Sequence, residues 1–167
     1  MPRSLLPSLV CTCVLSLMGC AGLRDGVYSD GATRYRVGPL PASWQQLNVS
    51  GNDVTYLSRD SGHSLAINAT CEDTDDPPLD VLTRHLLMGF TARQTMSQVA
   101  QRMSGREALR THVRAELDGV PVELELVVLK KDGCVYDFTY LSPPGQLAAR
   151  EAVFEQVLAN FQAGDKP

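Results

Sequence analysis

The sequence has no excess of basic residues, since 15 Lys and Arg stand against 19 Asp and Glu and give a formal net charge of -4. Phosphate binding needs clustered Lys and Arg, so this balance argues against a nucleic-acid partner and against a polybasic membrane surface. The sequence also has only three histidines, His63, His85 and His112, and their spacing matches no metal-binding motif. We therefore expect neither a metal nor another cofactor.

Charge is missing altogether from Leu5 to Met18. This stretch has the layout of a secretory signal peptide and is shorter than the roughly 20 apolar residues of a membrane-spanning helix. It ends in Leu17-Met18-Gly19-Cys20, which resembles the lipobox of bacterial lipoproteins. The resemblance implies removal of residues 1–19, diacylglyceryl attachment to the Cys20 sulfur and acylation of the new amino terminus. The alternative is an ordinary secretory signal that happens to contain a cysteine.

Lipid on Cys20 makes a membrane the first expected partner of this chain. One acyl chain binds a bilayer only marginally, whereas two or three give a stable anchor at about 0.8 kcal/mol per buried methylene. Ala21 stands where an aspartate would, by resemblance to enterobacterial sorting, retain a lipoprotein in the inner membrane. We therefore expect a palmitate-bearing protein of the bacterial envelope, in the outer membrane and facing the periplasm.

Cysteine becomes scarce once the chain is processed. Of the five cysteines, Cys11 and Cys13 leave with the signal peptide, and Cys20 is assigned to lipid. Cys71 and Cys134 remain, and in an oxidising periplasm such a pair is a candidate disulfide. Two buried free thiols are the alternative.

The mature chain is predicted to hold one globular domain. A chain of 167 residues with 44% hydrophobic content can bury one core of ordinary size. We divide the sequence into a signal peptide over 1–19, a lipidated anchor and flexible tether over 20–32, and a single domain over 33–163.

Strands and helices are expected to alternate in blocks along this domain. Turn residues over 59–62 indicate a hairpin between two of the first three extended segments. Asp76 as N-cap and Pro77 in the first turn predict a helix that ends near Gly89, and Pro143-Pro144 predicts the start of a last helix. The extended segments lie at about 34–38, 52–58 and 64–71.

Residues 106–141 predict an antiparallel meander. Apolar and polar residues alternate up to Leu117, and Asp118-Gly119 is a strong signal for a two-residue hairpin. In that register the apolar faces coincide and opposite charges meet on the solvated face. The pairs are Leu117 with Val120, Ala115 with Val122, Val113 with Leu124, Thr111 with Leu126, Leu109 with Val128, His112 with Glu125 and Arg114 with Glu123.

The next turn, Lys131-Asp132-Gly133, allows a two- or a three-residue loop. The two-residue loop places Asp137 on the buried face against Val128. We prefer the three-residue loop, with Gly133 in the left-handed region, because it aligns apolar residues of both strands and turns Asp137 outward. The aligned residues are Val128, Leu126 and Leu124 with Tyr136, Phe138 and Tyr140.

This order of elements predicts an α+β fold, in which an antiparallel sheet of about six strands with a C-terminal meander is covered by two helices. Over roughly residues 33–162 the order resembles the Mog1/PsbP-like group, which includes a bacterial lipoprotein branch. The resemblance implies an α/β/α sandwich and says little about activity.

Candidate chemical sites are few. Gly62-His63-Ser64-Leu65-Ala66 looks like the nucleophile elbow of hydrolases, but the residues after it alternate as a strand rather than a helix. Acidic residues crowd the loop over 72–76 without the spacing of a calcium loop. Trp44 is the only tryptophan, and we expect it in the core or, alternatively, in a ligand groove. Asp137 is expected to be an ordinary strand carboxylate, or else a perturbed acid in a cleft.

Three functions are compatible with these features. The first is a non-enzymatic envelope lipoprotein that docks on a partner protein or helps to assemble a membrane complex. The second is a carrier of a lipid or small apolar ligand that uses a cavity near Trp44. The third is a hydrolase that uses Ser64.

The lipid assignment predicts that the native protein incorporates radiolabelled palmitate and begins at Cys20. Both results follow from transfer of diacylglycerol to the Cys20 thiol and cleavage after Gly19. Palmitate labelling and the mass of the N-terminal peptide measure them. A protein that takes up no palmitate, or that still begins at Met1, would refute the assignment.

Overall fold

The computed structural model describes residues 21–71 and 76–164. Its strands are β1 (Gly22–Arg24), β2 (Val27–Ser29), β3 (Arg34–Arg36), β4 (Trp44–Leu47), β5 (Val54–Ser58), β6 (Ser64–Thr70), β7 (Phe90–Met103), β8 (Arg106–Leu117), β9 (Val120–Lys131), β10 (Cys134–Ser142) and β11 (Gln162–Ala163). Its helices are α1 (Leu79–Leu86), the 3-10 turn η1 (Leu147–Arg150) and α2 (Glu151–Asn160).

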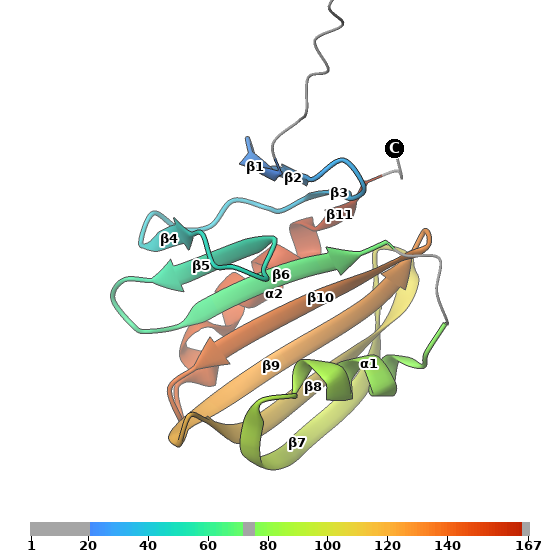
Figure 1. Cartoon of the computed structure of the whole chain (residues 1–167). Coiled ribbons are helices and arrows are strands. Elements are labelled where there is room, and N and C mark those ends of the chain that lie inside the picture. The colour runs from blue at the N-terminus through green and yellow to red at the C-terminus, as the bar shows by residue number, and fades with distance from the viewer. Residues whose placement is uncertain (1–20, 72–75, 165–167) are drawn as a thin grey trace, which may run out of the picture.

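These elements form two antiparallel sheets. The large sheet has the strand order β4-β5-β6-β10-β9-β8-β7, and the small sheet has the order β1-β2-β3-β11. Helices α1 and α2 lie on opposite faces of the large sheet, and the small sheet lies at the end of the molecule that is remote from β7 (Figure 1). The predicted α+β fold with an α/β/α arrangement is confirmed, with more strands than the six expected.

The register of the first predicted hairpin of the meander is confirmed. All seven predicted pairs between β8 and β9 occur, from Leu117 opposite Val120 to Leu109 opposite Val128. Asp118 and Gly119 close the turn with φ values of 51° and 79°. Two successive residues with positive φ form the turn whose twist fits a two-residue hairpin.

The predicted register of the second hairpin is wrong. Asp132 (φ 54°) and Gly133 (φ 76°) form another two-residue turn, so Asp137 lies opposite Val128 and Phe138 lies opposite Val127. The apolar run of β9 is buried on both faces, and apolar alternation therefore does not distinguish the two registers. The alternative that we set aside is the one that the chain adopts.

This register places Asp137 in a desolvated position on the face opposite α2. Its Oδ1 atom is buried and has no hydrogen-bond partner within the part of the chain that the structure describes. Burial raises the pKa of Asp137 to about 6. The expectation of an ordinary, outward-facing carboxylate is therefore corrected.

Each face of the large sheet has its own core. On the α2 side, the apolar stripe predicted for the last helix is buried against β10. The Phe154 ring stacks on Tyr140 with ring centroids 5.1 Å apart, and the Phe161 ring centroid lies 4.9 Å from that of Phe138. On the α1 side, the buried residues are Leu87, Val113, Ala115, Val122, Leu124 and Leu126.

The folded part of the chain begins earlier than predicted. The segment expected to be a tether over 20–32 contains β1 and β2, and Tyr28 is 5% exposed with its ring stacked 5.0 Å from Tyr35. The folded part of the chain therefore includes the residues from Gly22 onward, which were expected to be a tether. The lipobox and Cys20 lie outside the described residues.

The helix starts also differ in detail from the prediction. Helix α1 begins at Leu79 with Pro78 as its N-cap residue, and its cap has no side-chain hydrogen bond. Asp76 instead accepts a hydrogen bond from Lys130 Nζ at 2.5 Å. After Pro143, the 3-10 turn η1 precedes α2, so the last helix starts later than its proline signal suggests.

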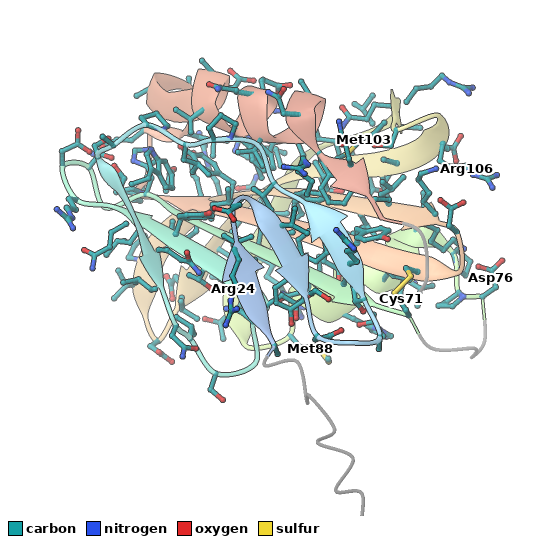
Figure 2. All side chains as sticks on the ribbon, turned by 90° about the horizontal axis from the view of Figure 1, so that it is seen from above. Arg24, Cys71, Asp76, Met88, Met103 and Arg106 are labelled. Atoms are coloured by element: carbon teal, nitrogen blue, oxygen red, sulfur yellow. A yellow bond between two sulfur atoms is a disulfide. The ribbon has the colours of Figure 1, made fainter. Side chains whose placement is uncertain are left out.

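The candidate disulfide is present. Cys71, at the end of β6, is bonded to Cys134, at the start of β10, across 63 residues of sequence (Figure 2). In the chain-entropy model a loop of this length stabilises the folded state by about 4 kcal/mol. The bond joins two strands that are already neighbours in the sheet.

The buried carboxyl of Asp137 predicts a pH-dependent cost. Because its folded pKa is raised, the folded state binds this proton more tightly than the unfolded state, and stability is lost as pH rises from about 4 to about 6. Asp137→Asn should therefore raise the free energy of unfolding at pH 7 by up to about 3 kcal/mol, and by less near pH 4. Urea unfolding at both pH values measures the difference.

The matched control is Asp118→Asn in the exposed turn between β8 and β9, which should bring no comparable gain. An Asp137→Asn variant that is equally stabilised at both pH values, or destabilised at pH 7, would contradict the burial assigned to this carboxyl.

Candidate functional site

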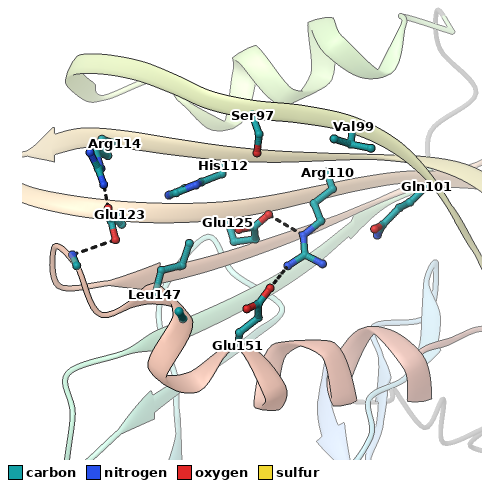
Figure 3. Close-up of a pocket in the computed structure, with 12 residues that line it drawn as sticks. Ser97, Val99, Gln101, Arg110, His112, Arg114, Glu123, Glu125, Leu147 and Glu151 are labelled. Atoms are coloured by element: carbon teal, nitrogen blue, oxygen red, sulfur yellow. Dashed lines mark hydrogen bonds and ion pairs between the residues drawn. The ribbon is translucent and has the colours of Figure 1, made fainter.

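A groove of about 630 Å³ lies on the α2 side of the large sheet, over its outer strands (Figure 3). It is open there because α2 packs its aromatic stripe on β10 and leaves the polar faces of β7, β8 and β9 uncovered. The residues that line it come from these strands and from the chain around η1: Ser97, Val99, Gln101, Arg110, His112, Arg114, Glu123, Glu125, Gly145, Leu147, Ala148 and Glu151.

Arg110 of β8 is the centre of the charged network in this groove. Its Nε donates to Glu125 Oε1 at 2.6 Å, its Nη2 lies 3.4 Å from Glu151 Oε1, and its Nη1 pairs with Glu155. Burial by itself lowers the pKa of Arg110, but hydrogen bonds to Glu125 and Glu155 outweigh this effect and the pKa is raised. One guanidinium thus joins the sheet to helix α2.

A second ion pair lies at the other end of the groove. Glu123 is 3% exposed and accepts a hydrogen bond from Arg114 Nε at 2.7 Å, as the strand register predicts. Its Oε2 accepts a second one, from the Gly145 backbone N–H at 3.0 Å. The hydrogen bond from Arg114 is the main reason why the pKa of Glu123 is lowered. Glu123 therefore holds the loop before η1 against the sheet.

The other predicted charge pair does not form, although its register is correct. His112 lies opposite Glu125, but Glu125 binds Arg110 instead. The Nε2 atom of His112 is buried in the groove wall and has no hydrogen-bond partner among residues 21–71 and 76–164. Among the described residues that line the groove, it is the buried side-chain polar atom left without a hydrogen-bond partner.

The predicted elbow and ligand-groove residues lie elsewhere. Ser64 begins strand β6, and no helix follows it. Its neighbour His63 is 1% exposed and bonds the Ser61 hydroxyl at 2.9 Å and the Gln146 carbonyl at 3.1 Å, so it ties two loops together. Trp44 is 7% exposed and its ring lies 6.2 Å from that of Tyr140, which places it in the core.

Metal ligands are not assembled in the described part of the chain. There, no group of three or more His, Cys, Asp or Glu side chains is arranged to hold an ion. His85 is an exposed residue near the end of α1. Of the acidic loop over 72–76, only Asp76 is described.

The sequence analysis did not predict strand β7, whose residues Ser97, Val99 and Gln101 form one wall of the groove. Residues 90–103 show no apolar alternation because the strand is exposed on both faces for most of its length. The available signal was Ser104-Gly105, another turn pair with positive φ, which folds this segment back on β8. The roles of Glu151 and Glu155 could not be predicted from the sequence either, since these residues contact Arg110 only when α2 packs on the sheet.

Comparison with known proteins identifies the fold. No family model and no curated protein sequence matches this chain. Among solved structures, PsbP of Synechocystis sp. PCC 6803 has a TM-score of 0.56 at 18% identity and covers 89% of this chain and 99% of its own. LpqN of Mycobacterium tuberculosis, described as involved in cell envelope biogenesis, has a TM-score of 0.56 at 15% identity and covers 83% of this chain and 87% of its own.

A third similar structure is Mog1p of Saccharomyces cerevisiae, described as a Ran-binding protein. Its TM-score is 0.55 at 12% identity, and the match covers 81% of this chain and 92% of Mog1p. The structural similarity to these proteins shows a common Mog1/PsbP-like fold, as the order of elements suggested.

The groove network predicts that Arg110 stabilises the fold more than an ordinary surface arginine does. Arg110→Met leaves the Glu125 carboxylate in a site only 10% exposed without its cation, which should lower the free energy of unfolding by about 3 kcal/mol. Arg84→Met, which breaks the exposed pair with Asp80, should cost far less, because solvent screens that pair. Urea unfolding of both variants measures this, and equal losses would contradict the assigned role.

Proposed function

We propose that this chain is a non-enzymatic lipoprotein of the bacterial envelope. Lipid on Cys20 holds it at a membrane, in the outer membrane and facing the periplasm, and its folded domain binds a partner protein along β7 and the adjoining groove. The lipobox supports the anchor, and the LpqN likeness is compatible with work in the envelope. Within the described residues, no helix has both the length and the apolar character needed to cross a bilayer.

The observation that carries the binding role is the exposed edge of the large sheet. β7 is 14 residues long, stands last in the strand order and exposes Met96 by 41% and Val99 by 60%. An edge strand presents backbone N–H and C=O groups that can pair with a strand of another chain. A long edge of this kind is a binding surface unless it is interrupted.

Only the first half of β7 is interrupted. Its pairing with β8 shifts register between Thr91 and Gln94 and again between Thr95 and Ser97, whereas the pairing from Ser97 to Met103 is continuous. Such irregularities protect edges from unwanted pairing. The regular half is also the half that sends Ser97, Val99 and Gln101 into the groove. A partner strand added there would lie beside β7 in the plane of the sheet, with alternate side chains on the same face as Ser97, Val99 and Gln101.

The residues that suggested the carrier and hydrolase functions do not occupy the positions that those functions need. A ligand carrier was suggested by Trp44, which packs in the core against Tyr140. A hydrolase was suggested by Ser64, which lies in a strand rather than at a strand-to-helix elbow.

Site-specific photo-crosslinking in intact cells tests the binding role. A photoreactive amino acid at position 99 should give a protein adduct of one discrete mass, because Val99 lies on the regular half of the edge. The matched control is position 120, where Val120 is 62% exposed but lies at the turn between β8 and β9.

Two outcomes would contradict the proposal. The same adducts at positions 99 and 120 would indicate random collision rather than docking. Adducts with lipid alone at position 99 would favour the carrier function.

A further inference from the structure

The small sheet begins immediately after the proposed lipid site. Gly22 is the first residue of β1, and Ala21 alone separates it from Cys20. Since one residue spans at most about 3.6 Å, the Cα atoms of Cys20 and Gly22 are no more than about 7 Å apart. A lipid on Cys20 therefore leaves no tether, and the small sheet must lie close to the membrane surface.

The outer face of this sheet is basic. Side chains alternate along β3, where Tyr35 is fully buried and Arg34 and Arg36 are exposed. The register places Val27 between Arg24 and Arg36 in one row across the sheet, with Leu23 in the next row, toward the core. Arg24, Arg34 and Arg36 thus project from one face, and Figure 2 views the molecule from the side on which these strands lie.

These three arginines differ from those of the groove in having no carboxylate partner. Arg110 and Arg114 each form an ion pair, whereas Arg24, Arg34 and Arg36 form none with another described residue. Arg36 Nη1 donates a hydrogen bond to the backbone carbonyl of Asp25 at 3.4 Å, which leaves its charge unneutralised. The positive charge of the face is therefore available to an external anion.

Acidic residues near the face offset only part of this charge. Residues 21–36 contain three arginines and two aspartates, in a chain whose net charge is -4. The Oδ1 atom of Asp30 accepts hydrogen bonds from the backbone N–H groups of Ala32 and Thr33. This carboxylate is therefore engaged by the backbone of the loop between β2 and β3. Asp25 lies in the turn that joins β1 and β2.

We infer that the outer face of the small sheet lies on the bilayer, with Arg24, Arg34 and Arg36 against the phosphates of anionic phospholipids. The inference rests on the proposed lipid at Cys20, which fixes this face within a few ångströms of the headgroups. Arginine pairs with phosphate by two parallel hydrogen bonds, and each basic residue at an anionic membrane strengthens binding roughly fivefold. The domain then points β7 and the groove away from the membrane (Figure 1).

Arginine footprinting of the mature, lipidated protein tests this orientation. The protein is reconstituted in vesicles of phosphatidylglycerol with phosphatidylcholine, or of phosphatidylcholine alone, and is treated with an arginine-selective dicarbonyl reagent. We expect Arg24, Arg34 and Arg36 to react several-fold more slowly on the anionic vesicles. Arg84 and Arg93, on α1 and β7, should react equally on both.

A charge-matched pair of variants controls for net charge. R24Q/R34Q should weaken the protection of Arg36 on the anionic vesicles, because the face has lost two of its three phosphate contacts. R84Q/R106Q, which removes the same charge elsewhere, should leave the protection of Arg36 unchanged. Slower reaction of Arg84 and Arg93, or equal protection in all regions, would overturn the orientation.

The mass of the N-terminal peptide in the same sample separates this inference from the proposed function. A lipidated Cys20 with small-sheet arginines that react alike on both vesicle types would overturn the inference alone. An unmodified Cys20 with these arginines still protected would overturn the proposed anchor and keep the membrane-facing sheet. An unmodified Cys20 without protection would overturn both.

Discussion

The burial of strand β9 on both of its faces is the constraint on which the rest of this structure depends. All residues from Val122 to Leu129 are buried, and they face α1 and α2 in alternation. Glu123 and Glu125 lie within this run, and an unpaired buried carboxylate is costly. Each therefore requires an arginine of β8. Arg110, which pairs with Glu125, also binds Glu151 and Glu155 of α2 and so links this helix to the sheet. The burial of β9 therefore accounts for both the core and the charged network of the groove.

Sequence reasoning succeeded where a strand has one apolar and one polar face, and failed where it does not. The β8–β9 register followed from alternation and from Asp118-Gly119, and all its pairs occur. β9 is buried on both faces, so a one-residue slip against β10 kept an apolar alignment and the wrong loop was chosen. β7 is exposed on both faces and carried no apolar pattern.

The candidate site could be predicted only in part for a related reason. Arg114 and Glu123 are strand neighbours, and their pairing is visible in the sequence. Arg110 pairs with carboxylates of β9 and of α2, up to 45 residues away in the sequence. These carboxylates come together only when α2 packs on the sheet. The early start of the fold at Gly22 was hidden by glycine and charge, which are typical of a tether. Its consequence is that the proposed anchor and the proposed binding edge lie at opposite ends of one domain.

Hydrogen exchange along β7 tests the central claim, that the edge of the large sheet is a partner's binding surface, most directly. Amides of Phe90–Met103 are compared between native outer membranes and vesicles that contain this protein alone. The account predicts slower exchange from Ser97 to Met103 in the native membranes, with β8, β9 and β10 unchanged. Equal exchange of β7 in both preparations would contradict it.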